Sequence, residues 1–167
     1  MRAYLSWLKE FSKKYLVDVH AWVLMSNHVH LLCTPYEENA ISKMMQSMGR
    51  MYVRYYNYTY QRSGTLWEGR FKSCLVESEQ YLLELYRYIE LNPVRAGMVE
   101  EPSEYSWSSY GCNALGVKTD LQMPHELYLK LGKTEEERLE NYRSLFKSHI
   151  DVELLKEIRE GVNKGLA

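Results

Sequence analysis

Two largely apolar runs near the start of the chain, residues 19–25 and 29–33, are separated by a Ser-Asn dipeptide and a histidine. Runs of this length that are rich in β-branched residues and flank turn-forming residues predict a β-hairpin. Successive side chains of a strand point to opposite faces, so we expect His28 and His30 to share one face of the second strand. The hairpin would then present two imidazoles side by side.

Helical periodicity appears on both sides of this hairpin. Apolar positions predict an amphipathic helix over residues 2–15 and a longer helix that starts after a loop at Pro35. The apolar stripe of the longer helix repeats at i, i+3, i+4 and i+7, and it consists of Ile41, Met44, Met45, Met48, Tyr52 and Tyr55. A methionine stripe at this spacing is typical of core packing.

The pattern continues with a short strand at residues 73–76 and a third helix from Glu79 to about Leu91. Pro93 disfavours helical geometry at Asn92, so we expect the third helix to stop there. The residues expected to face the core from this helix are Leu82, Leu85 and Ile89. After an irregular aromatic segment, three further helices are predicted over residues 124–131, 134–149 and about 152–163.

Charge is distributed unevenly along the chain. The net charge of −1 argues against a uniformly basic nucleic-acid binder. Residues 40–75 nevertheless carry six basic side chains and one acidic side chain. These basic residues are interleaved with tyrosines, a combination that suits single-stranded nucleic acid, although a solvated helix face is the alternative. The candidate DNA-binding residues are Lys43, Arg50, Arg54, Arg62, Arg70 and Lys72.

The cysteine pattern and hydropathy indicate a cytoplasmic protein. The three cysteines are far apart and form no C-x-x-C pair, which predicts reduced thiols rather than disulfides or a zinc knuckle. No apolar run approaches the roughly 20 residues that a membrane span requires. Charged residues interrupt the apolar positions of the N-terminus, so we expect no signal peptide.

Two pairs of residues carry candidate chemistry. His28 and His30 could bind one metal ion and leave coordination positions for water and a phosphate oxygen. A bare His-x-His is more often a half-buried strand whose histidines only bond their neighbours. Tyr88 and Asn92 are four residues apart and would be neighbours on one helix face. In a chain with 15 tyrosines, however, any one of them is by default a packing residue.

Three ordered motifs together resemble a known family. They are AWVLMSNHVH at residues 21–30, GTLWEGRF at residues 64–71 and YIELNPVRAG at residues 88–97. In this order they resemble the HUH single-tyrosine transposases, and within them the REP-associated tyrosine transposases. The resemblance implies an α+β, ferredoxin-like antiparallel sheet with flanking helices and a divalent Mg²⁺ or Mn²⁺ site. It also implies a transposase that cleaves and rejoins single-stranded DNA beside hairpins.

The resemblance assigns roles to individual residues. His28 and His30 are the expected metal ligands, with Asn92 completing the metal site, and Tyr88 is the expected nucleophile. A tyrosine that attacks a phosphodiester keeps the bond energy in a 5′-phosphotyrosine, so the strand can be rejoined without a nucleotide cofactor. A nearby cation should help the tyrosine to lose its proton, and the sequence leaves Arg87 and Arg95 both open for this role.

The chain departs from the family pattern at its start. Members usually open with a β-strand, whereas this chain opens in the first helix, so we expect residues 1–110 to be a catalytic domain that lacks its first strand. Residues 111–167 are expected to form a helical C-terminal extension. The missing strand would leave unpaired edges beside residues 28–33 and 73–76. Other backbone should fill them, either from this chain or from a second copy in a homodimer.

Two other functions stay open. The chain could be a catalytically impaired protein that binds DNA hairpins through its basic, tyrosine-rich surface. It could also be a metal-dependent nuclease that uses water in place of Tyr88. The first alternative needs neither metal nor Tyr88, and the second needs metal but should tolerate Tyr88→Phe.

Overall fold

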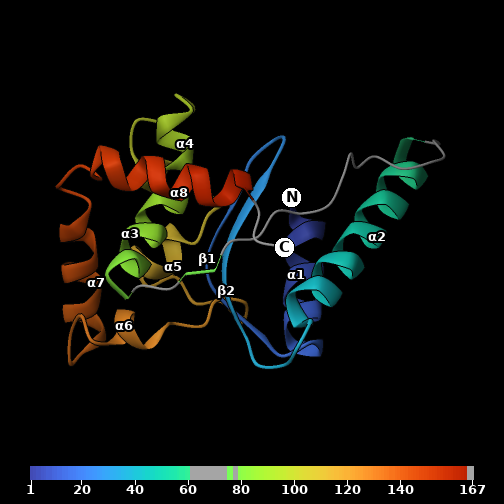
Figure 1. The fold of residues 1–167 in the computed structure, drawn as a ribbon, viewed down its shortest axis with the longest axis horizontal. Coiled ribbons are helices and arrows are strands. Elements are labelled where there is room, and N and C mark those ends of the chain that lie inside the picture. The colour runs from blue at the N-terminus through green and yellow to red at the C-terminus, as the bar shows by residue number, and fades with distance from the viewer. Residues whose placement is uncertain (61–74, 77–78, 165–167) are drawn as a thin grey trace. The chain divides into compact units, whose positions relative to one another are not determined.

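A computed structural model describes residues 1–60, 75–76 and 79–164 of the chain (Figure 1). The chain forms two compact units. The first unit comprises residues 1–18 and 34–71, and the second comprises residues 19–33 and 72–167. The expected domain boundary at residues 110 and 111 stays a prediction.

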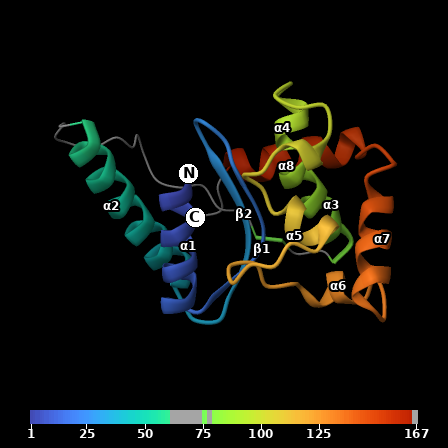
Figure 2. The same ribbon diagram turned by 180° about the vertical axis from the view of Figure 1, so that it is seen from behind.

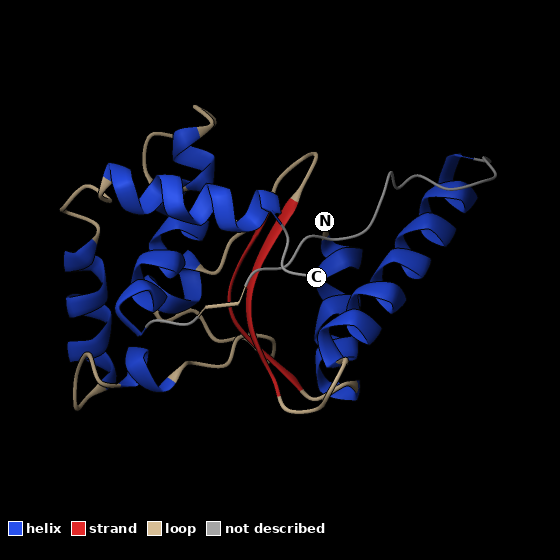
Figure 3. Ribbon diagram, in the orientation of Figure 1, coloured by secondary structure: helices blue, strands red, loops and turns tan. Residues whose placement is uncertain are grey.

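The predicted hairpin is confirmed. Strand β1 spans Val17–Leu24 and strand β2 spans Val29–Pro35, and together they form a two-stranded antiparallel sheet, drawn in red in Figure 3. The backbone N–H of Met25 donates to the carbonyl of His28 at 2.9 Å and closes the turn. Seven of the eight residues of β1 are buried, as expected of a strand that has protein on both faces.

Backbone from later in the chain pairs with the edge of β1 that faces away from β2. Leu24 donates its N–H to the carbonyl of Trp107 at 2.8 Å, and the N–H of Met123 reaches the carbonyl of Val19 at 2.9 Å. Between them, the N–H of Ser109 donates to the carbonyl of Trp22 at 2.9 Å. The C-terminal part of the chain therefore satisfies strand groups that would otherwise be unpaired.

The short strand expected at residues 73–76 is wrong for the two residues that the structure describes. Leu75 and Val76 lie in no strand, and their side chains are 68% and 36% exposed. With so little burial, packing does not stabilise an extended ladder there. Ser73 and Cys74 lie outside the described residues.

The first unit is built on two helices, as the periodicity predicts. Helix α1 spans Arg2–Lys14 and helix α2 spans Ala40–Tyr60. The α2 stripe buries Met44 and Met48, which confirms the methionines as core residues. The two helices pack together through Trp7 and Tyr55, whose ring centroids are 5.5 Å apart.

The second unit contains the remaining helices (Figure 2). Their bounds are α3 Glu79–Glu90, α4 Asn92–Arg95, the 3-10 turn η1 Pro102–Glu104, α5 Tyr110–Leu115, α6 Glu126–Leu129, α7 Glu135–Leu145 and α8 Val152–Lys164. Helix α7 begins as predicted, because the Thr134 hydroxyl accepts from the N–H of Glu137 at 3.2 Å. Helix α5 does not follow from the sequence pattern.

Pro93 acts differently from our expectation. Helix α3 does end before Pro93, but Asn92 is helical and starts the single turn α4, in which Pro93 occupies the first turn. Proline is tolerated there because its missing N–H would have no partner within the helix. The chain therefore passes from α3 into α4 with a break only at Leu91.

The core of the second unit joins the hairpin to α3 and to the C-terminal helices. It includes Ala21 and Val23 of β1, Ile89 of α3, and Tyr128 and Tyr142 of the C-terminal helices. Buried residues on both sides of residue 110 therefore contribute to one apolar cluster. This cluster fixes α3 beside the strands that carry the histidines.

Candidate functional site

The two histidines meet at the start of β2. His28 is exposed and immediately precedes the strand, whereas His30 lies within it and is half-buried. Their ring centroids are 4.9 Å apart with an interplanar angle of 74°. This arrangement agrees with the expectation that the two imidazoles lie side by side.

Each imidazole is held in a form that suits metal binding. Nδ1 of His28 lies 2.7 Å from the amide oxygen Oδ1 of Asn27, which fits an N–H donated by the ring. That contact leaves Nε2 of His28 available to a ligand. Burial, together with the positive charges of His28 and Arg95, lowers the pKa of His30 to about 4. His30 is therefore a neutral imidazole at neutral pH, the form that coordinates metals.

Tyr88 lies next to this pair, in the last turn of α3. Its ring centroid is 6.0 Å from that of His30, at an interplanar angle of 73°. The Tyr88 side chain is only 9% exposed. The fold thus brings together residues that are almost 60 positions apart in the sequence, through the packing of α3 against the hairpin.

Arg95 of α4 covers Tyr88. Its guanidinium carbon is 4.1 Å from the centroid of the tyrosine ring, and its Nη2 donates to the main-chain carbonyl of Tyr88 at 2.5 Å. Arg87, by contrast, is directed elsewhere. Its Nη1 donates to both carboxylate oxygens of Glu84 at 2.8 and 3.0 Å, and its Nη2 donates to the carbonyl of Ser148. Of the two arginines that the sequence leaves open, the structure places Arg95 on the tyrosine.

Asn92 is half-buried at the first position of α4. Its assignment as a metal ligand stays a prediction. Within the described residues, no group of three or more histidine, cysteine, aspartate or glutamate side chains is arranged to hold a metal ion. A metal at the histidine pair would therefore complete its coordination with groups of another kind, such as an amide oxygen, water or phosphate.

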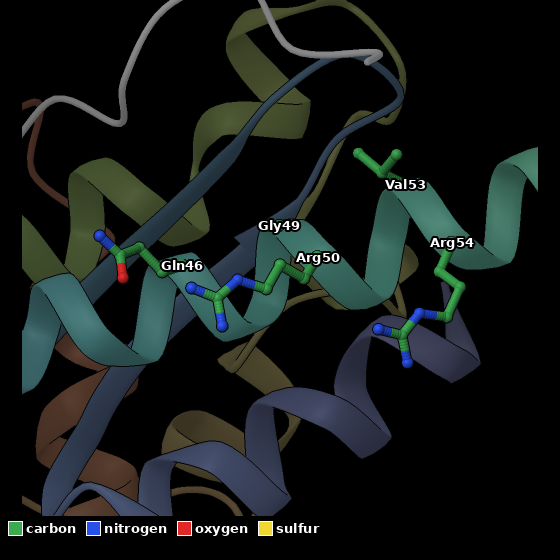
Figure 4. A pocket seen from close by; sticks show the side chains of 5 residues that line it. All are labelled: Gln46, Gly49, Arg50, Val53 and Arg54. Carbon is green, nitrogen blue, oxygen red and sulfur yellow. The ribbon is translucent and has the colours of Figure 1, made fainter. Parts of the chain in front are cut away.

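The basic residues of α2 lie on its exposed face. Lys43, Arg50 and Arg54 are all solvent-exposed. Arg50 and Arg54 line a shallow pocket together with Gln46, Gly49 and Val53 (Figure 4). The other three candidate DNA-binding residues, Arg62, Arg70 and Lys72, lie outside the described residues.

The structure also identifies a buried carboxylate that sequence analysis missed. Glu90 is fully buried on α3, two residues after Tyr88. It accepts hydrogen bonds from Ser109 Oγ at 2.9 Å, Asn113 Nδ2 at 2.7 Å and Tyr142 Oη at 2.7 Å. Burial raises the pKa of Glu90 to about 7, against the opposing effect of these three donors. Its only signal in the sequence is a charged residue at a core position of the helix.

Two further predictions concern the cysteines and the hydropathy of the helices. Neither Cys33 nor Cys112, the cysteines in the described ranges, forms a disulfide bond, which agrees with the expected thiols. No helix in the described ranges is long and apolar enough to cross a bilayer.

Of three comparisons with known proteins, a family model and a solved structure match this chain, and the curated proteins do not. A family model described as "Transposase IS200 like" matches residues 2–92, which is more than half of the chain. A solved structure described as "Structure of the REP associates tyrosine transposase bound to a REP hairpin" is similar to this fold, with a TM-score of 0.55 at 18% identity. That similarity covers 73% of each chain. No curated protein matches the sequence.

Proposed function

The chain belongs to the IS200-like transposase family, and on that premise we propose that it cuts and rejoins single-stranded DNA beside hairpins through a covalent tyrosine–DNA intermediate. The observation that carries this proposal is the position of Tyr88 against His30, within one compact unit. A hydroxyl nucleophile beside two imidazoles suits metal-assisted phosphodiester cleavage, because the imidazoles can hold the metal while the hydroxyl attacks phosphorus.

The histidine pair fits a divalent cation. His30 is neutral, and the contact of His28 with Asn27 leaves Nε2 of His28 free to bind. We expect His28, His30 and Asn92 to hold Mg²⁺ or Mn²⁺. Such an ion would polarise an oxygen of the scissile phosphate and neutralise charge on it.

Tyr88 would carry the covalent step. Its Oη loses a proton to solvent and forms a bond to phosphorus, while the bond from phosphorus to the 3′ oxygen breaks. The 3′ oxygen takes up a proton, so the upstream fragment leaves with a free 3′-hydroxyl. The downstream fragment stays attached to Tyr88 through its 5′ phosphate. Attack of a 3′-hydroxyl on the phosphotyrosine reverses the reaction, so strands can be joined without an energy-rich cofactor.

DNA would be bound in part through α2. The cations Lys43, Arg50 and Arg54 can contact phosphates, and Tyr58, which is 86% exposed, offers a ring face for an unpaired base. The structural relative is bound to a hairpin, which supports a hairpin as the substrate of this chain.

The experiment is incubation of 3′-end-labelled hairpin DNA that carries a single-stranded flank with protein and Mn²⁺, followed by denaturing electrophoresis. We expect a labelled protein–DNA band. Tyr88→Phe should abolish the band and leave DNA binding unchanged, because only a hydroxyl is removed. His28→Ala or chelation should also abolish it. Tyr81→Phe, which changes another tyrosine of α3, is the matched control and should retain the band.

The outcomes separate the proposal from its alternatives. Persistence of the band in Tyr88→Phe would place the nucleophile elsewhere. Strand cleavage without a covalent band, unaffected by Tyr88→Phe, would indicate a nuclease that uses water. Hairpin binding without any cleavage under all metal conditions would leave only a DNA-binding protein.

A further inference from the structure

Arg95 is held against Tyr88 by the local backbone as well as by its side chain. The turn α4 closes with the N–H of Arg95 donating to the carbonyl of Leu91 at 2.9 Å, and the N–H of Ala96 donating to that of Asn92 at 3.0 Å. This turn brings Arg95 next to Tyr88, which lies seven residues earlier in the chain. The Tyr88 carbonyl lies in the last turn of α3, and the guanidinium of Arg95 supplies a donor to it.

Among the residues that the structure describes, no carboxylate forms an ion pair with Arg95. The ion pairs found among the described residues involve other cations. The charged group that acts on it from the packed helix α8 is Arg159, which repels it. Burial also lowers the pKa of Arg95, although a guanidinium keeps its proton at neutral pH. Arg95 is solvent-exposed, so an incoming anion can reach its charge.

A guanidinium can stack on an aromatic ring and donate hydrogen bonds to a phosphate at the same time. One face of Arg95 lies over Tyr88, and one N–H is directed to the Tyr88 carbonyl. The guanidinium has five N–H donors in a fixed plane, so others remain for a phosphate oxygen. Arg87 offers no such surface, because Glu84, the Ser148 carbonyl and the ring of Phe146 surround it.

We propose that Arg95 is a positioning residue of the cleavage reaction, which fixes the ring of Tyr88 for attack and binds the scissile phosphate through its remaining N–H groups. This inference rests on the proposed function, since it requires Tyr88 to be the nucleophile. The ring contact restricts the rotation of Tyr88, and the phosphate contact aligns phosphorus with Oη. Alignment of this kind acts on the rate of attack more than on the affinity for DNA.

The first test is a single-turnover measurement of adduct formation at saturating hairpin DNA with Mn²⁺. Arg95→Gln should lower the rate by about 100-fold, the order expected on removal of one preorganised donor. Its dissociation constant for hairpin DNA should change by no more than about 3-fold, because a single phosphate contact contributes little to the total affinity. Arg95→Lys keeps the charge without the planar fork and should restore part of the rate.

Arg159→Gln is the matched control, since it removes one positive charge close to Arg95 but touches no part of the tyrosine ring contact. It should leave the rate near that of the parent protein. A rate for Arg95→Gln equal to that of Arg159→Gln would overturn the proposal. If Arg95 only closed the end of α3, its removal would lower the thermal midpoint, the affinity and the rate together.

A second test does not depend on activity. With 3-fluorotyrosine in place of Tyr88, the fluorine NMR signal of the folded protein should be displaced from that of the free amino acid. Arg95→Gln should move the signal toward the free value and narrow it. The same label in place of Tyr81, two turns earlier in α3, should not respond. An unchanged signal at position 88 would show that Arg95 does not hold the ring.

The two tests distinguish failure of the inference from failure of the proposed function. If the fluorine signal is displaced and depends on Arg95, but the protein forms no adduct, then the ring contact is supported and the proposed cleavage activity is wrong. If the adduct forms at a rate that Arg95→Gln does not change, then the proposed cleavage activity is supported and the inference about Arg95 is wrong.

Discussion

At the scale of single residues, Asn27 illustrates how a turn former can take part in a site. In the sequence it marks the break between two strands, and in the structure its amide oxygen lies 2.7 Å from Nδ1 of His28. Imidazole has two nitrogens, and the partner of one decides which nitrogen faces a metal. The contact with Asn27 therefore leaves Nε2 of His28 as the nitrogen that would face the proposed metal.

We predict that Asn27→Ala weakens Mn²⁺ binding by about 10-fold or more, the usual effect of removing a hydrogen-bond partner of a metal-bound histidine. Isothermal titration of the DNA-free protein with Mn²⁺ measures this directly. Ser26→Ala, at the neighbouring exposed turn position, is the control and should bind Mn²⁺ like the parent. Equal affinities for all three proteins would show that Asn27 has no role in the site.

At the scale of secondary structure, α2 combines a buried methionine face with an exposed basic face. The basic residues are spaced so that the helix can follow a sugar–phosphate backbone, and their contribution to binding should be electrostatic. Such binding weakens with salt in proportion to the number of phosphates that are neutralised.

We predict that replacing Lys43, Arg50 and Arg54 by glutamine reduces the log–log salt slope of single-stranded DNA binding by about 2, because each neutralised phosphate contributes about 0.7 to the slope. Fluorescence anisotropy across a salt series measures the slope. The matched control replaces the exposed residues Lys130, Lys133 and Lys147 by glutamine, which gives the same change in net charge. If both triple variants change the slope equally, net charge rather than the α2 face controls binding.

Elements with strong periodicity could be predicted from the sequence, and short ones could not. The hairpin, α1, α2, α3 and α7 follow from alternation, helical spacing and caps. Helix α5 has only six residues, and its limits are set by tertiary contacts such as the bond from Ser109 to β1. Helix α3 ends before Pro93 as expected, but the chain resumes a helical turn at Asn92, because local sequence does not reveal whether a chain continues as a helix around a proline.

At the scale of the whole molecule, Glu90 connects α3 to α5 and α7. Its carboxylate is fully buried and receives three hydrogen bonds, one of them from Tyr142 at 2.7 Å. A buried carboxylate that is deprived of a donor carries a larger desolvation penalty than an exposed one. The same donor and acceptor pair occurs at the surface, where Tyr36 donates to Asp18 at 2.7 Å.

We predict that Tyr142→Phe lowers the free energy of unfolding by about 1–3 kcal/mol, because it leaves a buried acceptor without its partner. Tyr36→Phe removes a bond of the same kind from an exposed pair and should destabilise the protein less than Tyr142→Phe does. Urea denaturation of the two variants and the parent, followed by circular dichroism, provides the comparison. Equal destabilisation would mean that burial of Glu90 does not strengthen this contact.

Sequence reasoning reached the candidate site but not its surroundings. The three ordered motifs identified His28, His30 and Tyr88, and the fold brings their rings together. Periodicity alone could not have done this, since it carries no information about which helix lies beside which strand. The partners of Glu90 and the choice between Arg87 and Arg95 depend on contacts between distant segments, which only the folded chain defines.

The pairing of β1 with residues 107–123 has a consequence for synthesis on the ribosome. The strand is translated before its partners, because its outer edge bonds to Trp107, Ser109 and Met123, more than 80 residues later. Contacts of such sequence separation form slowly, and a nascent chain presents the edge unprotected until these residues emerge. If translation pauses before residue 107, the hairpin that carries the histidines would therefore be exposed with an unpaired strand edge. Chaperones could bind that edge, or it could pair with the same hairpin of a nascent chain on a neighbouring ribosome of the same mRNA.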